Sequence, residues 1–416
     1  VVVNLYAFEK VAAQRDAHLA ELIENIDIGG PTLIRAAAKN YQDVAVVVNP
    51  VRYDEILALL KQSDCSLSVD FKFSLMREAF RHTALYDSAI ANYFESKYGE
   101  KDFARRDSVA FGYSKDIPLR YGENPHQHAA LFGSFTQYCN CFHGKELSYN
   151  NILDATAAIR LVAEFDEPTV AIIKHTNPCG VASHKDIIQA YRDAFATDTA
   201  APFGGIVAVN RKIEADFAQV LNEIFLEILI APDFSEDALT ILKKKKDRRL
   251  LSVRLDAIRR LRDPDVRSVI GGVLVQDSDS VLLDANALKP VTERKPGVEE
   301  MKSLLFAWTV AKHVKSNAIV FANSQRTLGI GAGQMSRVDS VRLAIWKAHE
   351  MKLDLRNSVV ASDAFFPFAD NIEALSAAGA TAVIQPGGSM RDGEVIEAAN
   401  QKNVAMVFTG IRHFRH

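Results

Sequence analysis

The sequence is poor in cysteine, in excess charge and in long apolar runs, and each shortage excludes a class of protein. The four cysteines in 416 residues, Cys65, Cys139, Cys141 and Cys179, form no disulfide framework and lack partners at zinc-site spacing, which predicts a cytoplasmic protein. The net charge of −3 predicts no general affinity for nucleic acid or anionic membranes. No apolar run approaches the roughly 20 residues that cross a bilayer, so no membrane segment is expected.

What remains is the composition of a soluble globular protein, with 48% hydrophobic and 24% charged residues. A chain of this length can form two or three domains. In its first hundred residues, apolar runs at 1–8 and 44–49 alternate with helical patterns at 9–24, 33–39, 54–61 and 71–98. This alternation predicts a doubly wound parallel sheet. The pattern then lapses from 99 to 118, where charge dominates and a connector is expected.

The first residues already belong to a predicted strand, although the chain does not begin with Met. A strand is a poor place to begin a domain, because its neighbours in the sheet must come from elsewhere. We therefore expect a segment upstream of Val1 that this chain does not contain.

The stretch 169–182 combines a predicted buried strand with reactive side chains at its end. Apolar and β-branched residues lead into Lys174 and His175, and the Asn-Pro and Gly that follow predict a turn. A cation beside a histidine lowers the proton affinity of the imidazole, so His175 is a candidate general base. Taken alone, a solvated strand end with an ordinary turn histidine is the more frequent case.

Several other stretches are rich in glycine or aromatic residues. Gly29-Gly30-Pro31 predicts a helix N-terminus that could attract an anion, and Arg120 beside Tyr121 could hold a phosphate. The glycines at 329, 331 and 333 match a dinucleotide fingerprint only loosely. The segment 362–370 carries three phenylalanines around a proline, which predicts either a buried plug or a platform for a planar ligand. The basic run at 243–249 is expected to be a solvated helix end.

Together these motifs resemble one family, the bifunctional purine-biosynthesis enzyme AICAR formyltransferase/IMP cyclohydrolase. The matching stretches follow the family's order over essentially the whole chain: VVVNLYAF, ENIDIGGPTLIRAAAKN, LRYGENPHQ, KHTNPCGVA, PFGGIVAVN, KSNAIVFA, GIGAGQMSR, SDAFFPFADN, QPGGSMRD and IRHFRH. The resemblance implies an α/β protein in three parts. Residues 1–98 would form part of a methylglyoxal-synthase-like cyclohydrolase domain with a doubly wound parallel sheet, and 99–118 a connector. Residues 119–416 would form a formyltransferase domain of cytidine-deaminase-like subdomains.

The resemblance also implies two consecutive reactions, the last two of de novo purine biosynthesis. A formyl group would pass from the cosubstrate 10-formyltetrahydrofolate to the 5-amino group of AICAR, and the product FAICAR would close to IMP with loss of water. The implied ligands are therefore AICAR, FAICAR, IMP and folate, with no catalytic metal. A homodimer with formyltransferase sites shared between its subunits is expected.

For formyl transfer, the resemblance implies that His175 takes the amine proton beside the charge of Lys174, while Asn317 orients the formyl group. The residues implied for AICAR binding are Arg120, Tyr121, Phe203, Gly204, Glu227, Phe365 and Arg412. Glu227 stands at a position where an aspartate also occurs in the family. The residues implied for folate binding are Arg337, Val338, Asp370, Ser389 and Met390.

For ring closure, the resemblance implies catalytic roles for Tyr6, Asp27 and Lys39, with Asn4, Ile26 and Asp27 in contact with IMP. Lys39 would shuttle the proton, and Tyr6 would polarise the formyl oxygen. The family's first domain begins with a glycine- and serine-rich phosphate loop and a further catalytic lysine, and both would precede Val1. We expect a chain without that segment to lack cyclohydrolase activity and a chain with it to be active.

Two other functions stay open from the residues. Pro178-Cys179 suggests a zinc nucleoside deaminase, but the residue three after Cys179 is Ala182 rather than cysteine, and no H-x-E accompanies it. A non-catalytic folate- or nucleotide-binding module is the second alternative. The presence of Lys174, His175 and Asn317 together favours the enzyme.

Overall fold

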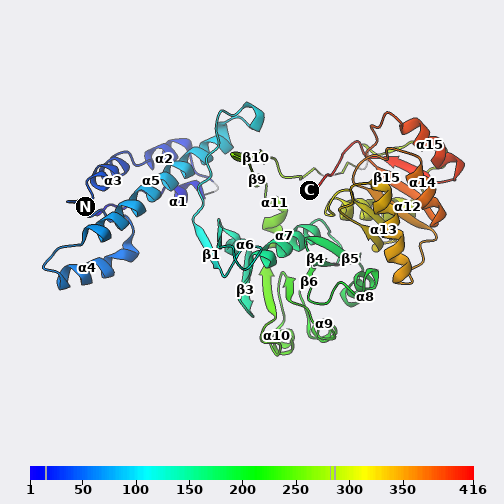
Figure 1. Ribbon diagram of the computed structural model, residues 1–416, viewed down its shortest axis with the longest axis horizontal. Helices are drawn as coiled ribbons and strands as arrows, with labels where there is room; N and C mark the ends of the chain where they lie inside the picture. Colours follow the sequence, from blue (N-terminus) through cyan, green and yellow to red (C-terminus); the bar gives the residue numbers. More distant parts are fainter. Residues whose placement is uncertain (15, 282, 285–286) are drawn as a thin grey trace. The chain divides into compact units, whose positions relative to one another are not determined.

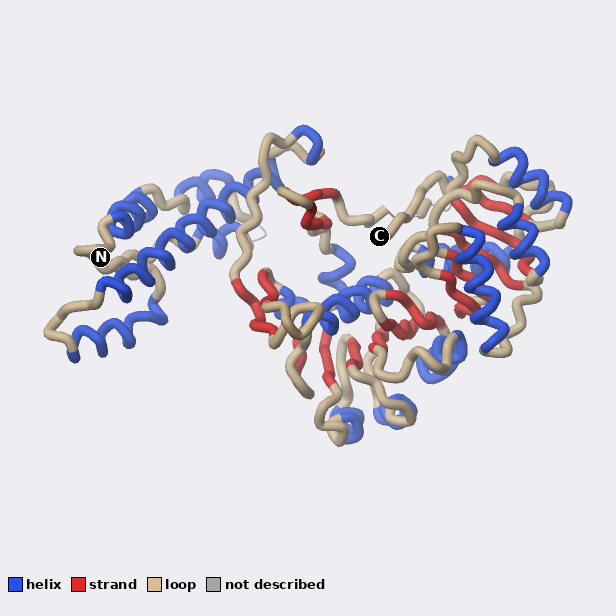
Figure 2. Tube along the Cα trace, viewed as in Figure 1, coloured by secondary structure: helices blue, strands red, loops and turns tan. Residues whose placement is uncertain are grey.

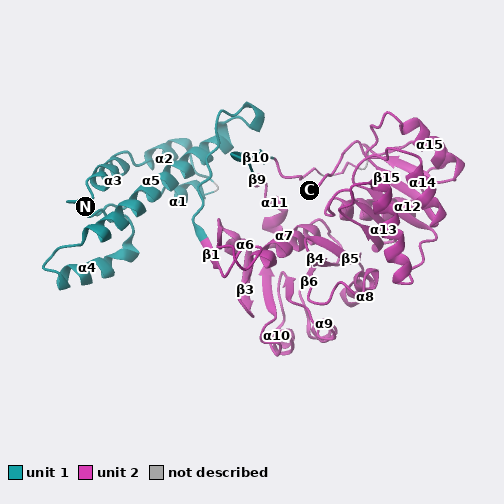
Figure 3. Ribbon diagram, viewed as in Figure 1, with its two compact units in different colours: residues 1–115, 266–276 teal, residues 116–265, 277–416 magenta. Residues whose placement is uncertain are grey.

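The computed structural model of the chain describes residues 1–14, 16–281, 283–284 and 287–416, which divide into two compact units (Figure 3). Unit 1 comprises 1–115 and 266–276, and unit 2 comprises 116–265 and 277–416. Among the described residues, none of the helices combines the length and the apolar character needed to span a membrane.

Unit 1 is mainly helical (Figure 1). Its elements are α1 (Phe8–Ala12), α2 (Leu19–Glu24), α3 (Gly29–Lys39), η1 (Pro50–Arg52), α4 (Tyr53–Gln62), α5 (Val69–Tyr98) and η2 (Phe103–Arg105). The helices predicted at 33–39, 54–61 and 71–98 are confirmed. The long α5 begins where the Ser68 hydroxyl accepts a hydrogen bond from the amide of Phe71. A small core forms where Ile34 and Ala38 of α3 pack with Val46, Val48 and Ala79.

The doubly wound sheet predicted for 1–98 is corrected by the structure. In the described part of this range, the runs at 1–8 and 44–49 pair as strands at a single isolated parallel bridge, between Val2 and Val47. Two short extended segments are too few for a stable ladder, so Val46 and Val48 are buried against helices instead. The single helix predicted for 9–24 is also wrong, because the backbone at His18 is extended and a separate helix begins after it. Residue 15 lies outside the described residues.

Unit 1 also contains a hairpin formed by β9 (Asp265–Val269) and β10 (Gly272–Gln276), where the hydrophobic pattern predicts one strand at 269–276. The strand is interrupted because Gly271 adopts a φ of +74°, a conformation that turns the chain back on itself.

Unit 2 is built on one twelve-stranded mixed sheet with helices on both faces (Figure 2). Its first half contains β3 (Cys139–His143), α7 (Tyr149–Ala163), β4 (Thr169–Lys174), β5 (Asn177–Ser183), α8 (Ile187–Thr197), β6 (Ile206–Val209), α9 (Ala215–Leu221), β7 (Ile228–Ala231), α10 (Glu236–Leu242), β8 (Arg249–Val253) and α11 (Leu255–Arg260). Its second half contains β11 (Lys289–Pro290), α12 (Val298–Ala311), β12 (Ile319–Asn323), β13 (Arg326–Gly331), α13 (Arg337–Glu350), β14 (Ser358–Ser362), α14 (Asp370–Ala377), β15 (Ala380–Gln385), α15 (Asp392–Gln401) and β16 (Ala405–Phe408). A small separate sheet pairs β1 (Lys115–Leu119) with β2 (Ala129–Phe132), and the short α6 (Phe135–Tyr138) precedes β3.

The large sheet contains an internal repeat. From its centre outward, the strands run β5, β4, β6, β7, β8, β3 on one side and β13, β12, β14, β15, β16, β11 on the other. In each half an antiparallel hairpin is followed by one antiparallel pair, two parallel pairs and an antiparallel edge strand. The halves join where β13 pairs with β5, with Arg326 opposite Ala182.

The alternation of side chains along each strand separates two layers of helices. Ala171 and Ile173 of β4 face the core that contains α7 and α12, whereas Val170 and Ile172 face the opposite core beneath α8, α9 and α10. In the second half, α13, α14 and α15 cover that opposite face. The apolar runs at 206–209 and 381–385 predict strands, and the apolar residues at helical spacing in 298–314 predict a helix; the structure confirms all three within a few residues.

Two strands at the centre of the sheet lie where the sequence predicts a turn, at Asn177-Pro178 and Gly180, and where it carries glycines, at 329 and 331. The turn lies one step earlier, at His175 and Thr176, and β5 starts at Asn177. Gly180 in β5 and Gly331 in β13 lie so close to α8 and α13 that a Cβ would come within 1.9 Å of the carbonyl oxygens of Ala194 and Ser340. These glycines therefore allow helices to pack tightly on strands.

We predict that Gly180→Ala destabilises unit 2 by about 2–4 kcal/mol, because the added methyl group overlaps a helix carbonyl that cannot move without displacing α8. Thermal unfolding of the full chain measures this effect. Gly393→Ala, whose added Cβ meets open space, is the matched control and changes stability by less than about 1 kcal/mol. Equal melting temperatures for the two variants would contradict the close packing described here.

Candidate active site

A cavity of about 430 Å³ lies in the second half of unit 2, at the edge of the sheet where β13, β14 and β16 end. This edge is a frequent binding place in α/β proteins. The lining residues come from four segments of the chain: Asn317, Met335, Ser336, Arg337, Val338, Ala364, Phe365, Pro367, Phe368, Asp370, Asn371, Arg412 and Phe414. The structure thus brings together six residues predicted for AICAR or folate sites or for catalysis, namely Asn317, Arg337, Val338, Phe365, Asp370 and Arg412.

The aromatic segment after β14 combines a buried side chain with side chains that line the cavity. Phe366 is fully buried in the core, whereas Phe365 and Phe368 remain partly exposed and line the cavity. The guanidinium of Arg391 lies 4.8 Å from the ring centre of Phe368, and the amide of Arg391 donates to the Ser389 hydroxyl. The Ser389–Met390 turn therefore lies beside the aromatic wall, although neither residue lines the cavity.

Asn317 is held rigidly at the polar side of this cavity. Its Oδ1 accepts a hydrogen bond from Arg337 Nη2 at 2.8 Å, and its Nδ2 donates to the carbonyl oxygens of Gln334 and Met335. Arg337 is itself buried and pairs with the fully buried Asp363. Arg337, predicted to bind folate, thus also fixes the orientation of Asn317, and Asp363 is a supporting residue that the sequence did not reveal.

Lys174 belongs to a second cluster, at the end of β4. Its ammonium donates to the carbonyl oxygens of Ala201 at 3.1 Å and Phe203 at 3.0 Å. Gly204 follows with a φ of +71°, and its amide donates to the carbonyl of Phe225. The rings of Phe203 and Phe225 lie 5.4 Å apart. Lys174 therefore anchors the loop that carries two residues predicted to bind AICAR.

His175 projects from a tight turn whose conformation depends on Asp154. His175 and Thr176 both have positive φ, at 53° and 61°, which side chains seldom adopt. The Asp154 carboxylate in α7 accepts hydrogen bonds from both of their amides, at 3.3 and 2.6 Å. Burial raises the pKa of Asp154, and the two N–H donors oppose that rise. The imidazole itself is exposed.

Glu227 lies just before β7, in reach of the same helix. Its carboxylate accepts from Asn151 Nδ2 at 3.1 Å and pairs with Arg249 at 3.0 Å. Asn151 and Asp154 are three residues apart and thus lie on one face of α7, a spacing that could have indicated a shared role.

The prediction of a solvated helix end at 243–249 is wrong for its last two arginines. The Arg248 side chain is buried and donates hydrogen bonds to the carbonyl of Leu226 and to the side chain of Asn222. Arg249 is buried against Glu227.

The two clusters adjoin through one hydrogen bond. The Asn177 side chain accepts from the backbone amide of Lys315 at 2.9 Å, which joins the His175 turn to the segment that leads into Asn317. Arg120 and Tyr121 contact each other after β1, with 5.3 Å between guanidinium and ring centre. Several predicted residues of the described chain lie outside the cavity lining: Lys174, His175, Arg120, Tyr121, Phe203, Gly204, Glu227, Ser389 and Met390.

In unit 1, the residues predicted for ring closure are only partly brought together. Asp27 accepts hydrogen bonds from the amides of Tyr6 at 3.3 Å and Gly30 at 2.7 Å, and its own amide donates to the Tyr86 hydroxyl. Ile26 precedes it, half-buried, and burial raises the pKa of Tyr86, which the sequence did not single out. Lys39 stands at the other end of α3, whose eleven residues span about 16 Å.

Other parts of the unit 1 site are held by their neighbours. Asn4 donates to the hydroxyl of Tyr53 at 3.0 Å, and the Tyr6 side chain is exposed. A Cβ on Gly30 would lie 2.5 Å from the Asp27 carboxylate, so glycine is required for Asp27 to close onto the start of α3.

The described residues offer neither a group of side chains that could bind a metal ion nor a reactive thiolate at Cys179. No group of three or more His, Cys, Asp or Glu side chains there is placed to hold a metal ion. Burial raises the pKa of the Cys179 thiol to about 12, so this cysteine is a neutral thiol at physiological pH.

Comparison with known proteins gives one consistent result. The family model described as the AICARFT/IMPCHase bienzyme matches residues 37–347. The chain is 55% identical to the bifunctional purine biosynthesis protein PurH of Chloroflexus aurantiacus, over all of this chain and 80% of that protein. It is 50% identical to the protein of the same name from Chlorobium phaeobacteroides and 49% identical to that from Persephonella marina, in each case over all of this chain and 81% of the relative. The chain therefore belongs to the AICARFT/IMPCHase bienzyme family.

Proposed function

We propose that unit 2 carries out the formyl transfer of this family and that unit 1 carries out the ring closure. The chain is a bifunctional enzyme of purine biosynthesis, with AICAR formyltransferase and IMP cyclohydrolase as its two activities. One observation supports the assignment of formyl transfer to unit 2 above others. Asn317, Phe365 and Arg412, which are far apart in the sequence, line a single cavity whose walls are aromatic and whose polar side is fixed.

The cavity suits 10-formyltetrahydrofolate as the formyl donor. Phe365, Phe368 and Phe414 offer flat apolar surfaces to a pterin ring, and Asp370 can accept hydrogen bonds from its amino and ring N–H groups. Arg412 supplies positive charge at the same opening for the phosphate of AICAR. We propose Arg120, which lies outside the cavity lining, as a second contact of this phosphate. We propose Val338, Ser389 and Met390 as further folate contacts, and Tyr121, Phe203, Gly204 and Glu227 as further contacts of AICAR.

Formyl transfer places two demands on the protein. The 5-amino nitrogen of AICAR is conjugated with its ring and is a weak nucleophile, so it must be positioned and must lose a proton as it attacks. The nitrogen attacks the formyl carbon to give a tetrahedral adduct, and His175 takes the proton that leaves the nitrogen. The adduct collapses by expelling N10 of the folate, which takes up a proton, and the products are FAICAR and tetrahydrofolate. Asn317 orients the formyl oxygen, and Lys174 keeps positive charge beside the imidazole.

For ring closure we propose Tyr6, Asp27 and Lys39 as catalytic residues, with Asn4 and Ile26 as contacts of IMP. The hydrogen bonds from Tyr6 and Gly30 to Asp27 support a site at the start of α3.

Two further proposals concern the protein as a whole. The repeat in unit 2 supports cytidine-deaminase-like subdomains, and the four free cysteines support a cytoplasmic location.

A homodimer with shared formyltransferase sites is also proposed. His175 is exposed and lies outside the cavity lining, so a second copy of the chain can contribute to a complete site. The β9–β10 hairpin exposes Val266, Val269, Ile270, Val273 and Leu274, a concentration of apolar side chains that a partner surface would cover.

The catalytic role of His175 predicts a large loss of rate on its removal. His175→Ala should lower kcat for folate-dependent formylation of AICAR by about 10²–10⁴-fold, because the leaving proton loses its acceptor. His349→Ala, at an exposed histidine of α13, is the control and should keep the wild-type rate. A wild-type rate in the His175 variant would remove its assignment as the base.

Asp154 is predicted to act by positioning the His175 turn. Asp154→Ala should reduce kcat by about 10-fold or more while KM for AICAR changes less, because the imidazole is displaced but the nucleotide contacts remain. Asp154→Asn keeps one acceptor oxygen and should recover part of the rate. Asp354→Ala, which removes an exposed carboxylate elsewhere, is the control. If KM rose by the same factor as kcat fell, and if the alanine and asparagine variants were equally impaired, the result would instead indicate a general structural defect.

Sharing of sites between subunits can be measured by complementation. Dimers reassembled from equal amounts of His175→Ala and Arg412→Gln chains should recover about a quarter of the wild-type formylation rate, because half of the dimers then contain one intact site. If both residues of a site came from one chain, the mixture would stay as inactive as its parents.

A further inference from the structure

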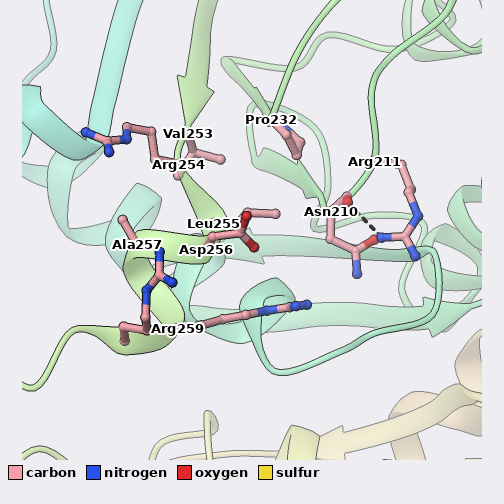
Figure 4. A pocket seen from close by; sticks show the side chains of 10 residues that line it. Asn210, Arg211, Pro232, Val253, Arg254, Leu255, Asp256, Ala257 and Arg259 are labelled. Carbon is pink, nitrogen blue, oxygen red and sulfur yellow. Dashed lines mark hydrogen bonds between the residues drawn. The ribbon is translucent and has the colours of Figure 1, made fainter.

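The internal repeat of unit 2 leads to a second cavity, of about 450 Å³, in the first half (Figure 4). It lies beyond the ends of β6, β7 and β8, the strands that match β14, β15 and β16 around the first cavity. The lining residues are Asn210, Arg211, Pro232, Val253, Arg254, Leu255, Asp256, Ala257, Arg259 and Arg260. Asn210 directly follows β6, Pro232 follows β7 and Arg254 follows β8.

The equivalence of the two cavities extends to individual hydrogen bonds. The amide of Asn210, after β6, donates to the carbonyl of Thr169 at 3.3 Å, and the amide of Asp363, after β14, donates to that of Ala318 at the same distance. Arg259 donates to the carbonyl of Phe165, two residues beyond α7. In the second half, Arg415 donates in the same way to the carbonyl of His313, two residues beyond α12. The two cavities therefore occupy matching places in the repeated motif.

The chemistry of the linings is different. The cavity of the second half has three phenylalanines and two arginines in its lining. The lining of the first-half cavity contains no aromatic side chain, four arginines (Arg211, Arg254, Arg259 and Arg260) and one carboxylate, that of Asp256. A planar ring thus meets no aromatic side chain among these residues, whereas an anion meets an excess of positive charge in a protein whose net charge is −3.

Two of the four arginines are held in place by the protein. Arg211 donates to the carbonyl oxygens of Asn210 and Asp166, and Arg259 donates to that of Ala163 while it pairs with the Asp166 carboxylate at 3.2 Å. Anchoring of this kind reduces the conformational entropy that a guanidinium loses when it binds a ligand. Arg254 and Arg260 are exposed at the same cavity, and among the described residues the Arg254 side chain donates only one long hydrogen bond, of 3.4 Å, to the carbonyl of Gln137, which leaves its other N–H groups for an anion.

We propose that this arginine pocket binds a phosphate group, carried either by inorganic phosphate or by a small phosphate monoester. The planar fork of arginine matches phosphate oxygens in pairs, and the end of a row of parallel strands is a common place for such ligands in α/β folds. The pocket binds phosphate whether or not the cavity of the second half binds folate, because the two have no lining residue in common.

The test compares phosphate binding by full-length variants at low ionic strength. Isothermal titration calorimetry with inorganic phosphate, and separately with ribose 5-phosphate, measures binding in a background of Arg120→Gln and Arg412→Gln, which weakens the AICAR phosphate site. Adding Arg254→Gln and Arg260→Gln should weaken the remaining phosphate binding by about 10-fold or more, since each lost charge-assisted contact is substantial. Adding Arg342→Gln and Arg356→Gln, two exposed arginines of the second half, removes the same charge and should leave binding unchanged.

The outcomes separate the alternatives. A selective loss in the Arg254 and Arg260 variant supports the pocket, and tighter binding of ribose 5-phosphate than of inorganic phosphate would identify the monoester as its ligand. Unchanged binding in that variant, or equal losses in it and in the charge-matched control, would overturn the proposal. An unchanged melting temperature of the Arg254 and Arg260 variant confirms that any loss is not due to unfolding.

Discussion

The structure of unit 2 depends on the contact at which its two half-sheets meet. There, β5 and β13 are held together by buried threonines: the Thr327 hydroxyl accepts from the amide of Val181 at 3.0 Å, and the Thr197 hydroxyl donates to the carbonyl of Thr327 at 2.7 Å. Thr197 and Thr327 are almost completely buried, so these bonds have no competition from water and any loss leaves an unsatisfied polar group. Because β4 and β12 flank this pair, the joint fixes the turn that carries His175 and the segment that carries Asn317.

Around this joint, the candidate catalytic groups are positioned by residues that need not touch a substrate. Asp154 holds the left-handed turn at His175, and Arg337 holds the amide of Asn317. The polar partners of these two residues come from other elements of unit 2. The site is thus a set of short, strained or exposed segments held by a rigid sheet, which is the arrangement that positioning and proton transfer require.

Sequence patterns were sufficient to predict the strands and helices that depend mainly on the residues within the segment itself. The strand at 206–209 and the helix beginning at 298 follow from continuous apolar residues and from helical spacing. The residues of the cavity lining could be named only through the family resemblance, because the segments that supply them are separated by up to about a hundred residues. Their convergence depends on the order of strands in the sheet.

Other features could not be predicted because they arise from tertiary contacts. The glycines of β5 and β13 resemble loop residues until the close approach of α8 and α13 is known. Arg248 and Arg249 resemble a solvated charge run until the carbonyl oxygens of Leu226 and Glu146 are seen to accept hydrogen bonds from their side chains. In 1–98 the hydrophobic pattern of strands is present, but the apolar runs pack on helices and form only one bridge. The repeat in unit 2 is visible in strand order, whereas the matching cavities contain different residues.

The central claim is that an imidazole at the end of β4 removes the proton from the amine of AICAR as the formyl group arrives. A crystal structure of the full-length protein with AICAR and a folate that cannot donate its formyl group tests this claim most directly. We predict a His175 ring nitrogen within about 3 Å of the 5-amino nitrogen, with the folate against Phe365. A structure in which both ligands are seated and every copy of His175 lies far from that nitrogen would contradict the account.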